Sequence, residues 1–176
     1  NLFQHPIRGA VEAFVADPEG AMILIKDVDD PERFGVARLE GDRVVEIIEK
    51  PTNPPTSYAV TGCYFYDSSV FDIINALEPS KRGELEITDV NRVYLERDEL
   101  QVETLGRGTA WLDTGTHETL LEAGMFVSML ESRQGLKIAC VEEIAWRMGW
   151  IDAGQLRRLA EPMAGNGYGQ YLLSLE

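Results

Sequence analysis

The sequence has 176 residues and a formal net charge of -14 at pH 7, with 44% hydrophobic and 26% charged residues. This composition is typical of a folded globular chain, and no stretch approaches the roughly 20 apolar residues that a membrane helix needs. The lack of a basic patch argues against a nucleic-acid partner, whereas phosphate ligands require only local cations or a metal. Cys63 and Cys140 show no metal-binding spacing, which predicts structural thiols in a reducing cytoplasm.

Residues 1–116 are predicted to contain the strands, together with short helices. Apolar runs and alternation predict strands at 21–28, 35–39, 43–49, 58–66 and 100–105. Gly41 and Asp42 predict a hairpin turn, and three prolines in 51–57 predict a loop. Helices are predicted at 69–77, capped by Ser68 or Ser69, and at 90–96, capped by Thr88 or Asp89.

Residues 117–176 are predicted to be almost entirely helical. The expected helices lie at 117–132 (stopped by Gly135), 141–148, 153–160 (with Asp152 and Gln155 in capping-box spacing) and 168–175. The pattern therefore predicts an α/β part followed by a helical tail. The strands do not complete a doubly wound sheet, so we expect those at 21–28 and 58–66 to lack sheet neighbours and to present exposed edges.

The segment 106–116 (GRGTAWLDTGT) combines three glycines with an acid between a strand and a long helix. Ligands bind at such strand ends in open α/β sheets. Asp113 could hold a hard cation, and Trp111 could pack against a sugar ring. The alternative is an ordinary turn in which Asp113 and Thr114 cap the helix and Trp111 belongs to the core.

Two further segments carry candidate binding groups. Lys50 could hold a phosphate and Glu49 could accept hydrogen bonds from sugar hydroxyls, the alternative being an exposed charge pair. Gly35 could allow close approach of a ligand covered by Phe34, the alternative being a turn glycine with positive φ. The acidic segment 83–89 is interpreted as helix capping. His5 and His117 lack ligand-spaced companions, so neither receives a metal role.

These segments occur in one order along the chain: DPERFGV, EIIEKP, YAVTGCYFYD, RGELEITDVNRVYL, GRGTAWLDTGTHETLLEA and RQGLKIACVEEIAWRMG, followed by NGYGQYL. The series resembles the short-form glucose-1-phosphate thymidylyltransferases, members of the sugar-phosphate nucleotidyltransferases, over nearly the whole chain. The resemblance implies a partial Rossmann-like mixed sheet of the nucleotide-diphospho-sugar transferase type in residues 1–116, and a helical tail in 117–176 that serves assembly and regulation.

The family's reaction is the attack of the glucose 1-phosphate phosphate on the α-phosphate of dTTP, which gives a dTDP-sugar and pyrophosphate with Mg²⁺. The resemblance assigns Asp113 to the metal and Lys50 to the sugar phosphate, both as catalytic residues. It assigns sugar contacts to Phe34, Gly35, Glu49, Val60 and Trp111. Phe34 stands where relatives often have tyrosine, so a hydroxyl contact to the sugar would be missing.

A regulatory nucleotide site is implied at Gly106, Arg107, Glu143, Ile144 and Arg147, with surface ion pairing as the alternative. Relatives use the tail in subunit contacts, which implies a homo-oligomer, usually a tetramer. The family's glycine-rich triphosphate loop and base-recognition residues do not occur, and its second metal aspartate would immediately precede Asn1. We therefore expect this chain to be inactive alone. The alternative is a non-catalytic nucleotide-binding or assembly module.

Overall fold

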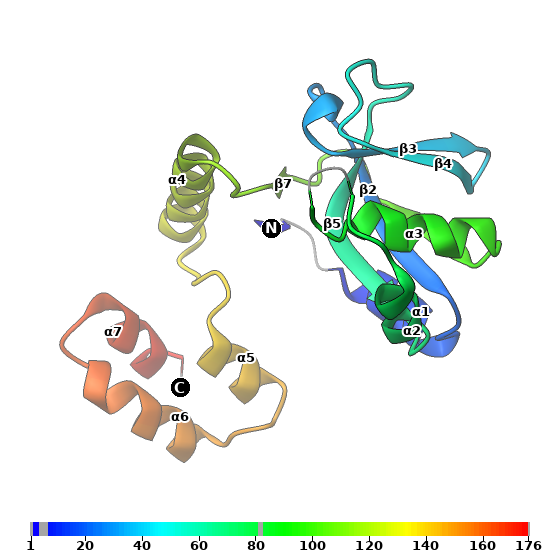
Figure 1. The fold of residues 1–176 in the computed structure, drawn as a ribbon. Coiled ribbons are helices and arrows are strands. Elements are labelled where there is room, and N and C mark those ends of the chain that lie inside the picture. Colours follow the sequence, from blue (N-terminus) through cyan, green and yellow to red (C-terminus); the bar gives the residue numbers. More distant parts are fainter. Residues whose placement is uncertain (1, 4–6, 81–82, 176) are drawn as a thin grey trace. The chain divides into compact units, whose positions relative to one another are not determined.

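The computed structural model describes residues 2–3, 7–80 and 83–175, so His5 lies outside the described residues. The chain forms two compact units, Asn1–Thr119 and Leu120–Glu176 (Figure 1). Each unit has its own hydrophobic core and is considered by itself. None of the described helices has the length and apolar character needed to span a membrane.

The first unit is built on a five-stranded sheet with the order β4-β3-β5-β2-β6. Its strands are β2 (Ala21–Asp27), β3 (Gly35–Glu40), β4 (Arg43–Glu49), β5 (Tyr58–Tyr66) and β6 (Leu100–Thr104). Only β6 runs parallel to its neighbour β2, and the other pairings are antiparallel. The predicted α/β fold with a mixed sheet is confirmed.

The prediction of an exposed edge is wrong for residues 21–28, whereas residues 58–66 pair with β3 only at Ala59, which lies opposite Val36. β2 lies between β5 and β6, and β5 lies between β2 and β3. The β3–β4 hairpin and β6 supply the neighbours that the sequence pattern did not place, and the sheet ends at β4 and β6 instead.

Helices cover both faces of β2, as Figure 1 shows. Met22 and Leu24 pack against α1 (Arg8–Ala16), a helix that the sequence analysis did not predict. Ala21 packs with residues of α2 (Val70–Ala76) and α3 (Ile87–Glu96) on the opposite face. Because side chains alternate along a strand, burial on both faces explains the continuous apolar run of this segment.

The helix starts differ in detail from the predicted caps. Ser69 stands at the N-cap of α2, but its Oγ donates to Asp67 Oδ1 at 2.6 Å and makes no cap hydrogen bond. The N-cap of α3 is Glu86, so neither Thr88 nor Asp89 caps this helix. Both predicted caps instead lie within its first turn, which frees Thr88 for a different contact.

Short elements complete the first unit. A 3-10 turn, η1 (Pro31–Arg33), precedes β3, and the two-residue strands β1 (Leu2–Phe3) and β7 (Trp111–Leu112) pair antiparallel. Leu2 lies opposite Leu112, and Phe3 lies opposite Trp111. This pairing ties the loop that follows β6 to the first described residues of the chain.

The second unit packs α5 (Val141–Arg147), α6 (Ala153–Ala160), η2 (Glu161–Met163) and α7 (Gly167–Leu173) around Cys140, Leu156, Ala160 and Leu172. The predicted capping box of α6 is confirmed, because Asp152 and Gln155 exchange side-chain-to-backbone hydrogen bonds of 2.7 and 2.9 Å. The long helix α4 (His117–Gln134) crosses the boundary between the units and ends at Gly135, whose φ is 70°.

Candidate functional site

One pocket of the first unit, with a volume of about 550 Å³, gathers every residue predicted for the sugar side of the site. These residues are Phe34, Gly35, Glu49, Lys50, Val60, Trp111 and Asp113. They come from the turn before β3, the paired ends of β3 and β4, the middle of β5, and β7 with the loop that follows it. Residues far apart in the sequence therefore share one concave surface.

Gly35 is closely packed at the end of the β3–β4 hairpin. It belongs to β3 and pairs with Glu49 of β4. A Cβ atom on Gly35 would lie 3.3 Å from Glu49 Oε2 and 3.5 Å from Thr88 Oγ1. The alternative of a positive-φ turn glycine is wrong, because Gly35 is an ordinary strand residue, and a Cβ there would only be in tight contact with Glu49.

The Glu49 carboxylate is held from inside the molecule. Thr88 Oγ1 donates a hydrogen bond of 2.6 Å to Glu49 Oε2, and Thr88 is only 3% exposed. The opposite oxygen, Oε1, lies 3.9 Å from Lys50 Nζ. At that separation the surface charge pair is a weak contact. A carboxylate held by Thr88 beside an exposed ammonium suits the recognition of hydroxyls next to a phosphate.

Lys50 has an unusual backbone. Its φ of 41° lies in the left-handed region, which costs a non-glycine residue about 1–2 kcal/mol. Its backbone N–H donates to the carbonyl oxygen of Phe34 at 3.0 Å, which links the end of β4 to the turn before β3. Strained backbone of this kind concentrates at binding and catalytic sites. The turn leaves the Lys50 side chain exposed at the pocket rim.

An aromatic wall forms one side of the pocket. The rings of Phe34 and Trp111 lie 4.9 Å apart between centroids, with an angle of 56° between their planes. The Arg33 guanidinium lies 5.4 Å from the centroid of Phe34, and its Nη1 donates to Asp30 Oδ2 at 2.8 Å. Trp111 is half-buried rather than a core residue. Such a wall can pack against the apolar face of a sugar ring.

Asp113 follows β7 and is free to bind a ligand. Its carboxylate accepts no hydrogen bond from the described residues, and α4 is capped instead by Thr116, whose Oγ1 accepts from the Thr119 N–H at 3.2 Å. The alternative in which Asp113 and Thr114 cap this helix is therefore wrong. A Cβ on Gly115 would lie 2.9 Å from Asp113 Oδ2, so this glycine leaves space for the carboxylate.

A hard cation fits Asp113 only as one ligand among several. The described residues contain no group of three or more His, Cys, Asp or Glu that could hold a metal ion. Mg²⁺ is commonly bound through one or two carboxylates, with substrate phosphates and water completing its octahedron. Asp113 could supply one such carboxylate from this pocket.

The pocket also contains residues that the sequence analysis did not select. Thr88 was interpreted only as a helix cap, and Tyr64 only as a strand residue. On β5, Val60 lies opposite Ile25 of β2, and Tyr64 lies opposite Ile23. The β2–β5 pairing is irregular between these two positions. Because side chains alternate along a strand, Val60 and Tyr64 lie on the same face of β5. The prediction of Val60 as a sugar contact could therefore have indicated Tyr64 as a pocket residue. Burial, with the nearby Glu49 charge, raises the pKa of Tyr64 to about 12, which keeps its hydroxyl neutral.

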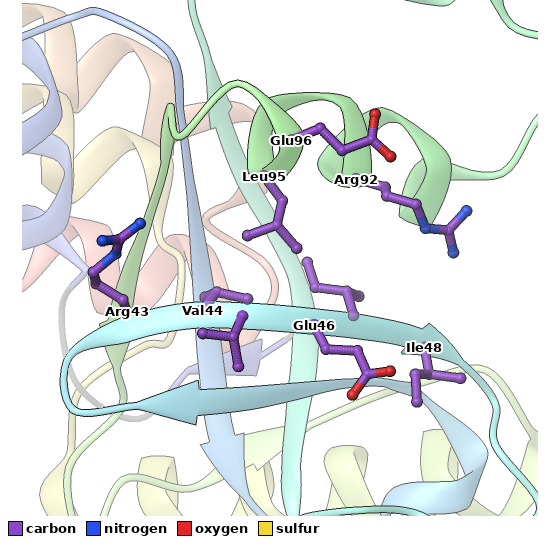
Figure 2. Close-up of a pocket in the computed structure, with 9 residues that line it drawn as sticks. Arg43, Val44, Glu46, Ile48, Arg92, Leu95 and Glu96 are labelled. Atoms are coloured by element: carbon purple, nitrogen blue, oxygen red, sulfur yellow. The ribbon is translucent and has the colours of Figure 1, made fainter.

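A second groove, with a volume of about 610 Å³, lies between β4 and α3. Figure 2 shows Leu95 of α3 directed toward β4, above apolar side chains of that strand. Its two arginines are engaged in ion pairs, Arg43 with Asp98 and Arg92 with Asp89. None of the residues predicted for the site lines this groove. The smaller pocket is therefore the better candidate, on chemistry rather than on volume.

The residues predicted for a regulatory nucleotide site fall in two groups. Gly106 and Arg107 are exposed in the loop before β7 of the first unit, whereas Glu143, Ile144 and Arg147 belong to α5 of the second. Glu143 is 8% exposed and accepts hydrogen bonds from Arg147 Nε at 2.7 Å and from the hydroxyl of Tyr171. The two groups belong to different units, and the regulatory site stays a prediction.

Internal contacts also explain the titration of Glu143. Burial by itself raises the pKa of Glu143, but the hydrogen bonds from Tyr171 and Arg147 outweigh it and hold the pKa below its ordinary value. Its carboxylate is thus a structural group that links α5 to α7. The Nε of Arg147 is engaged by this carboxylate.

Comparison with known proteins settles the family. Residues 1–129 match the family described as nucleotidyl transferase. The chain belongs to this family. Nucleotidyl transferases of known structure also share its fold: a UDP-glucose pyrophosphorylase in complex with UDP-glucose covers 70% of this chain with a TM-score of 0.60 at 24% identity. That likeness concerns the fold alone.

Several named nucleotidyl transferases agree with the resemblance seen in the sequence. Glucose-1-phosphate thymidylyltransferase of Xanthomonas campestris is 51% identical over 99% of this chain, and that of Mycolicibacterium smegmatis is 48% identical over 99%. A Bacillus anthracis structure, named for the same activity and in complex with sucrose, has a TM-score of 0.65 at 50% identity, covering 71% of this chain and 50% of its own. This chain spans only 60% of the Xanthomonas protein and 61% of the Mycolicibacterium protein.

Proposed function

We propose that this chain supplies the hexose 1-phosphate side of a glucose-1-phosphate thymidylyltransferase, which makes dTDP-glucose and pyrophosphate from dTTP and glucose 1-phosphate. The observation that carries the proposal is the meeting of Glu49, Lys50 and Asp113 beside an aromatic wall in one pocket. The names of relatives that are about half identical over nearly the whole chain support the choice of sugar and nucleotide.

The residues have distinct roles in this proposal. Lys50 attracts the sugar phosphate and stabilises the negative charge that accumulates during in-line transfer. Glu49, held by Thr88, accepts hydrogen bonds from ring hydroxyls, and Trp111 with Phe34 packs on the apolar face of the sugar. Gly35 and Val60 line the pocket where the ring would approach the backbone. No covalent nucleophile is needed, because the substrate phosphate itself attacks.

Asp113 would hold the Mg²⁺ that the family implies. The cation supplies charge neutralisation to the reacting phosphates. One carboxylate binds a hard cation weakly, so a second ligand from elsewhere in a complete enzyme, together with the nucleotide phosphates, is expected to complete the site. For the same reason the chain alone is expected to bind sugar phosphate without turning it over.

Titration calorimetry with glucose 1-phosphate tests the proposed pocket. We expect Lys50→Met to weaken binding by about tenfold or more, as expected for the loss of a charge-assisted contact. Lys26→Met removes the same charge outside the pocket and should leave binding unchanged. Equal effects of the two variants would refute the site. Pyrophosphate release from dTTP by this chain alone would refute the expected inactivity, whereas nucleotide binding without sugar-phosphate binding would favour a non-catalytic module.

Regulation and assembly form a separate part of the proposal. A nucleotide bound by Arg107 of the first unit or by Arg147 of the second would regulate the enzyme. Exposed apolar residues of α4, such as Leu121 and Met125, would bury their surface in a homotetramer. Sedimentation at several concentrations, with and without dTDP-sugar, tests both ideas. A monomer under all conditions would refute the assembly.

A further inference from the structure

The inward face of α3 carries polar side chains at every third position. Thr88, Asn91 and Tyr94 are 3%, 1% and 0% exposed. Residues three apart lie on one face of a helix, so these groups form a single buried row. Their side chains form hydrogen bonds with residues of the sheet or next to it: Thr88 with Glu49 at the end of β4, Asn91 with Tyr66 at the end of β5, and Tyr94 with Asp67, which follows β5.

The central member of this row meets a stack of tyrosine rings. Tyr66 OH donates a hydrogen bond of 2.6 Å to Asn91 Oδ1. The Tyr66 ring stacks on Tyr64 at 5.9 Å and on Tyr94 at 5.6 Å between centroids. Of these rings only Tyr64 lines the candidate pocket. Asn91 therefore lies one ring behind the pocket wall.

Asn91 is poorly satisfied for so buried a group. Its Nδ2 has no hydrogen-bond partner among the described residues, although the atom is buried. A buried amide with one unpaired end destabilises a core relative to an apolar residue of the same size. Stability therefore gives no reason for an asparagine here, and the bond that it accepts from Tyr66 is its evident contribution.

We propose that Asn91 is a positioning residue for the sugar pocket, fixing the Tyr66 hydroxyl and through that ring the orientation of Tyr64. This inference rests on the proposed function of the pocket. One turn earlier on the same helix, Thr88 fixes Glu49. The register of α3 against the sheet thus sets two pocket walls together, with Asn91 setting the aromatic one.

Isosteric variants separate positioning from simple stability. Asn91→Leu and Tyr66→Phe each remove the bond, and we expect each to weaken glucose 1-phosphate binding by the whole protein roughly three- to tenfold. Tyr94→Phe is the matched control, because it removes a hydroxyl from the same helix face and keeps its ring in the stack. It should lower the melting temperature but leave affinity within about twofold. Equal weakening by the control, or unchanged affinity in both test variants, would overturn the proposal.

A second readout does not depend on ligand binding. In protein labelled with 3-fluorotyrosine, the fluorine resonance of Tyr64, assigned with Tyr64→Phe, should move in Asn91→Leu and keep its position in Tyr94→Phe. An unmoved resonance in Asn91→Leu and in Tyr66→Phe contradicts the inference. If the wild-type protein binds no glucose 1-phosphate, the proposed function fails, and the resonance still decides the role of Asn91.

Discussion

Thr88→Val tests the contact that fixes Glu49. The substitution keeps the side-chain shape but removes the hydroxyl that donates to Glu49 Oε2 at 2.6 Å. A hydrogen bond to a charged group contributes about 1.5–3 kcal/mol. Because the Glu49 side chain is 31% exposed, water can replace part of this bond, and we expect a loss near the lower limit. About 1–1.5 kcal/mol corresponds to a roughly five- to twelvefold weaker binding of glucose 1-phosphate.

The measurement is a pair of titration calorimetry and thermal unfolding experiments on the same samples. Thr56→Val is the matched control, since Thr56 lies outside the residues that line the candidate pocket and its hydroxyl donates to the Ala37 carbonyl at 2.6 Å rather than to Glu49. It should lower stability by about 1 kcal/mol with little effect on affinity. The reasoning is refuted if Thr88→Val binds like the wild type, or if both variants lose affinity in proportion to stability.

Further predictions concern single contacts. Gly115→Ala should turn the Asp113 carboxylate away and weaken the Mg²⁺-dependent binding of glucose 1-phosphate by about tenfold. Its free energy of unfolding, measured by denaturant titration, should stay within about 1 kcal/mol of the wild-type value. Tyr171→Phe should cost the second unit about 1–2 kcal/mol at pH 7. A lowered pKa in the folded state means that Glu143 stabilises above its unfolded pKa, about 4.3, and that this stability is lost as the pH falls through the folded pKa. Unfolding at pH 7 and pH 3 should therefore differ less in Tyr171→Phe than in wild type, and an equal difference contradicts this role. Gly124→Ala, on α4 with nothing near its Cβ, should raise stability by about 0.5–1 kcal/mol, and a loss would indicate a contact partner for that face.

Local signals predicted most of the regular elements. The strand at 58–66 and the helix at 153–160 coincide with β5 and α6, because strong alternation and a complete capping box determine them locally. Helix α1 and the short pair β1–β7 were not predicted. The pairing of β1 with β7 joins segments at opposite ends of the first unit, and such a contact leaves no periodic trace in either segment. The sequence pattern predicted no strand order for the same reason, since strand neighbours depend on tertiary packing.

The sequence predicted the residues that line the candidate pocket, but not the contacts that hold their side chains in place. Lys50, Glu49 and Asp113 carry charges in short motifs, so their types and order were readable from the sequence. Thr88 was read as a cap, because threonine before a helix usually serves one. Its contact with Glu49 requires α3 to pack against the end of β4, and no local pattern specifies that contact.

The left-handed backbone at Lys50 has a consequence for engineering this protein. Glycine adopts that conformation without strain, so Lys50→Gly should recover part of the cost while deleting the ammonium group. A screen that selects for thermostability in the absence of ligand would therefore enrich glycine at this position. The selected variants would have lost the ammonium group proposed to bind the sugar phosphate, and the screen would not detect that loss. Screening in saturating glucose 1-phosphate would oppose this selection, because bound ligand stabilises variants that retain the lysine more than variants that bind the sugar phosphate weakly.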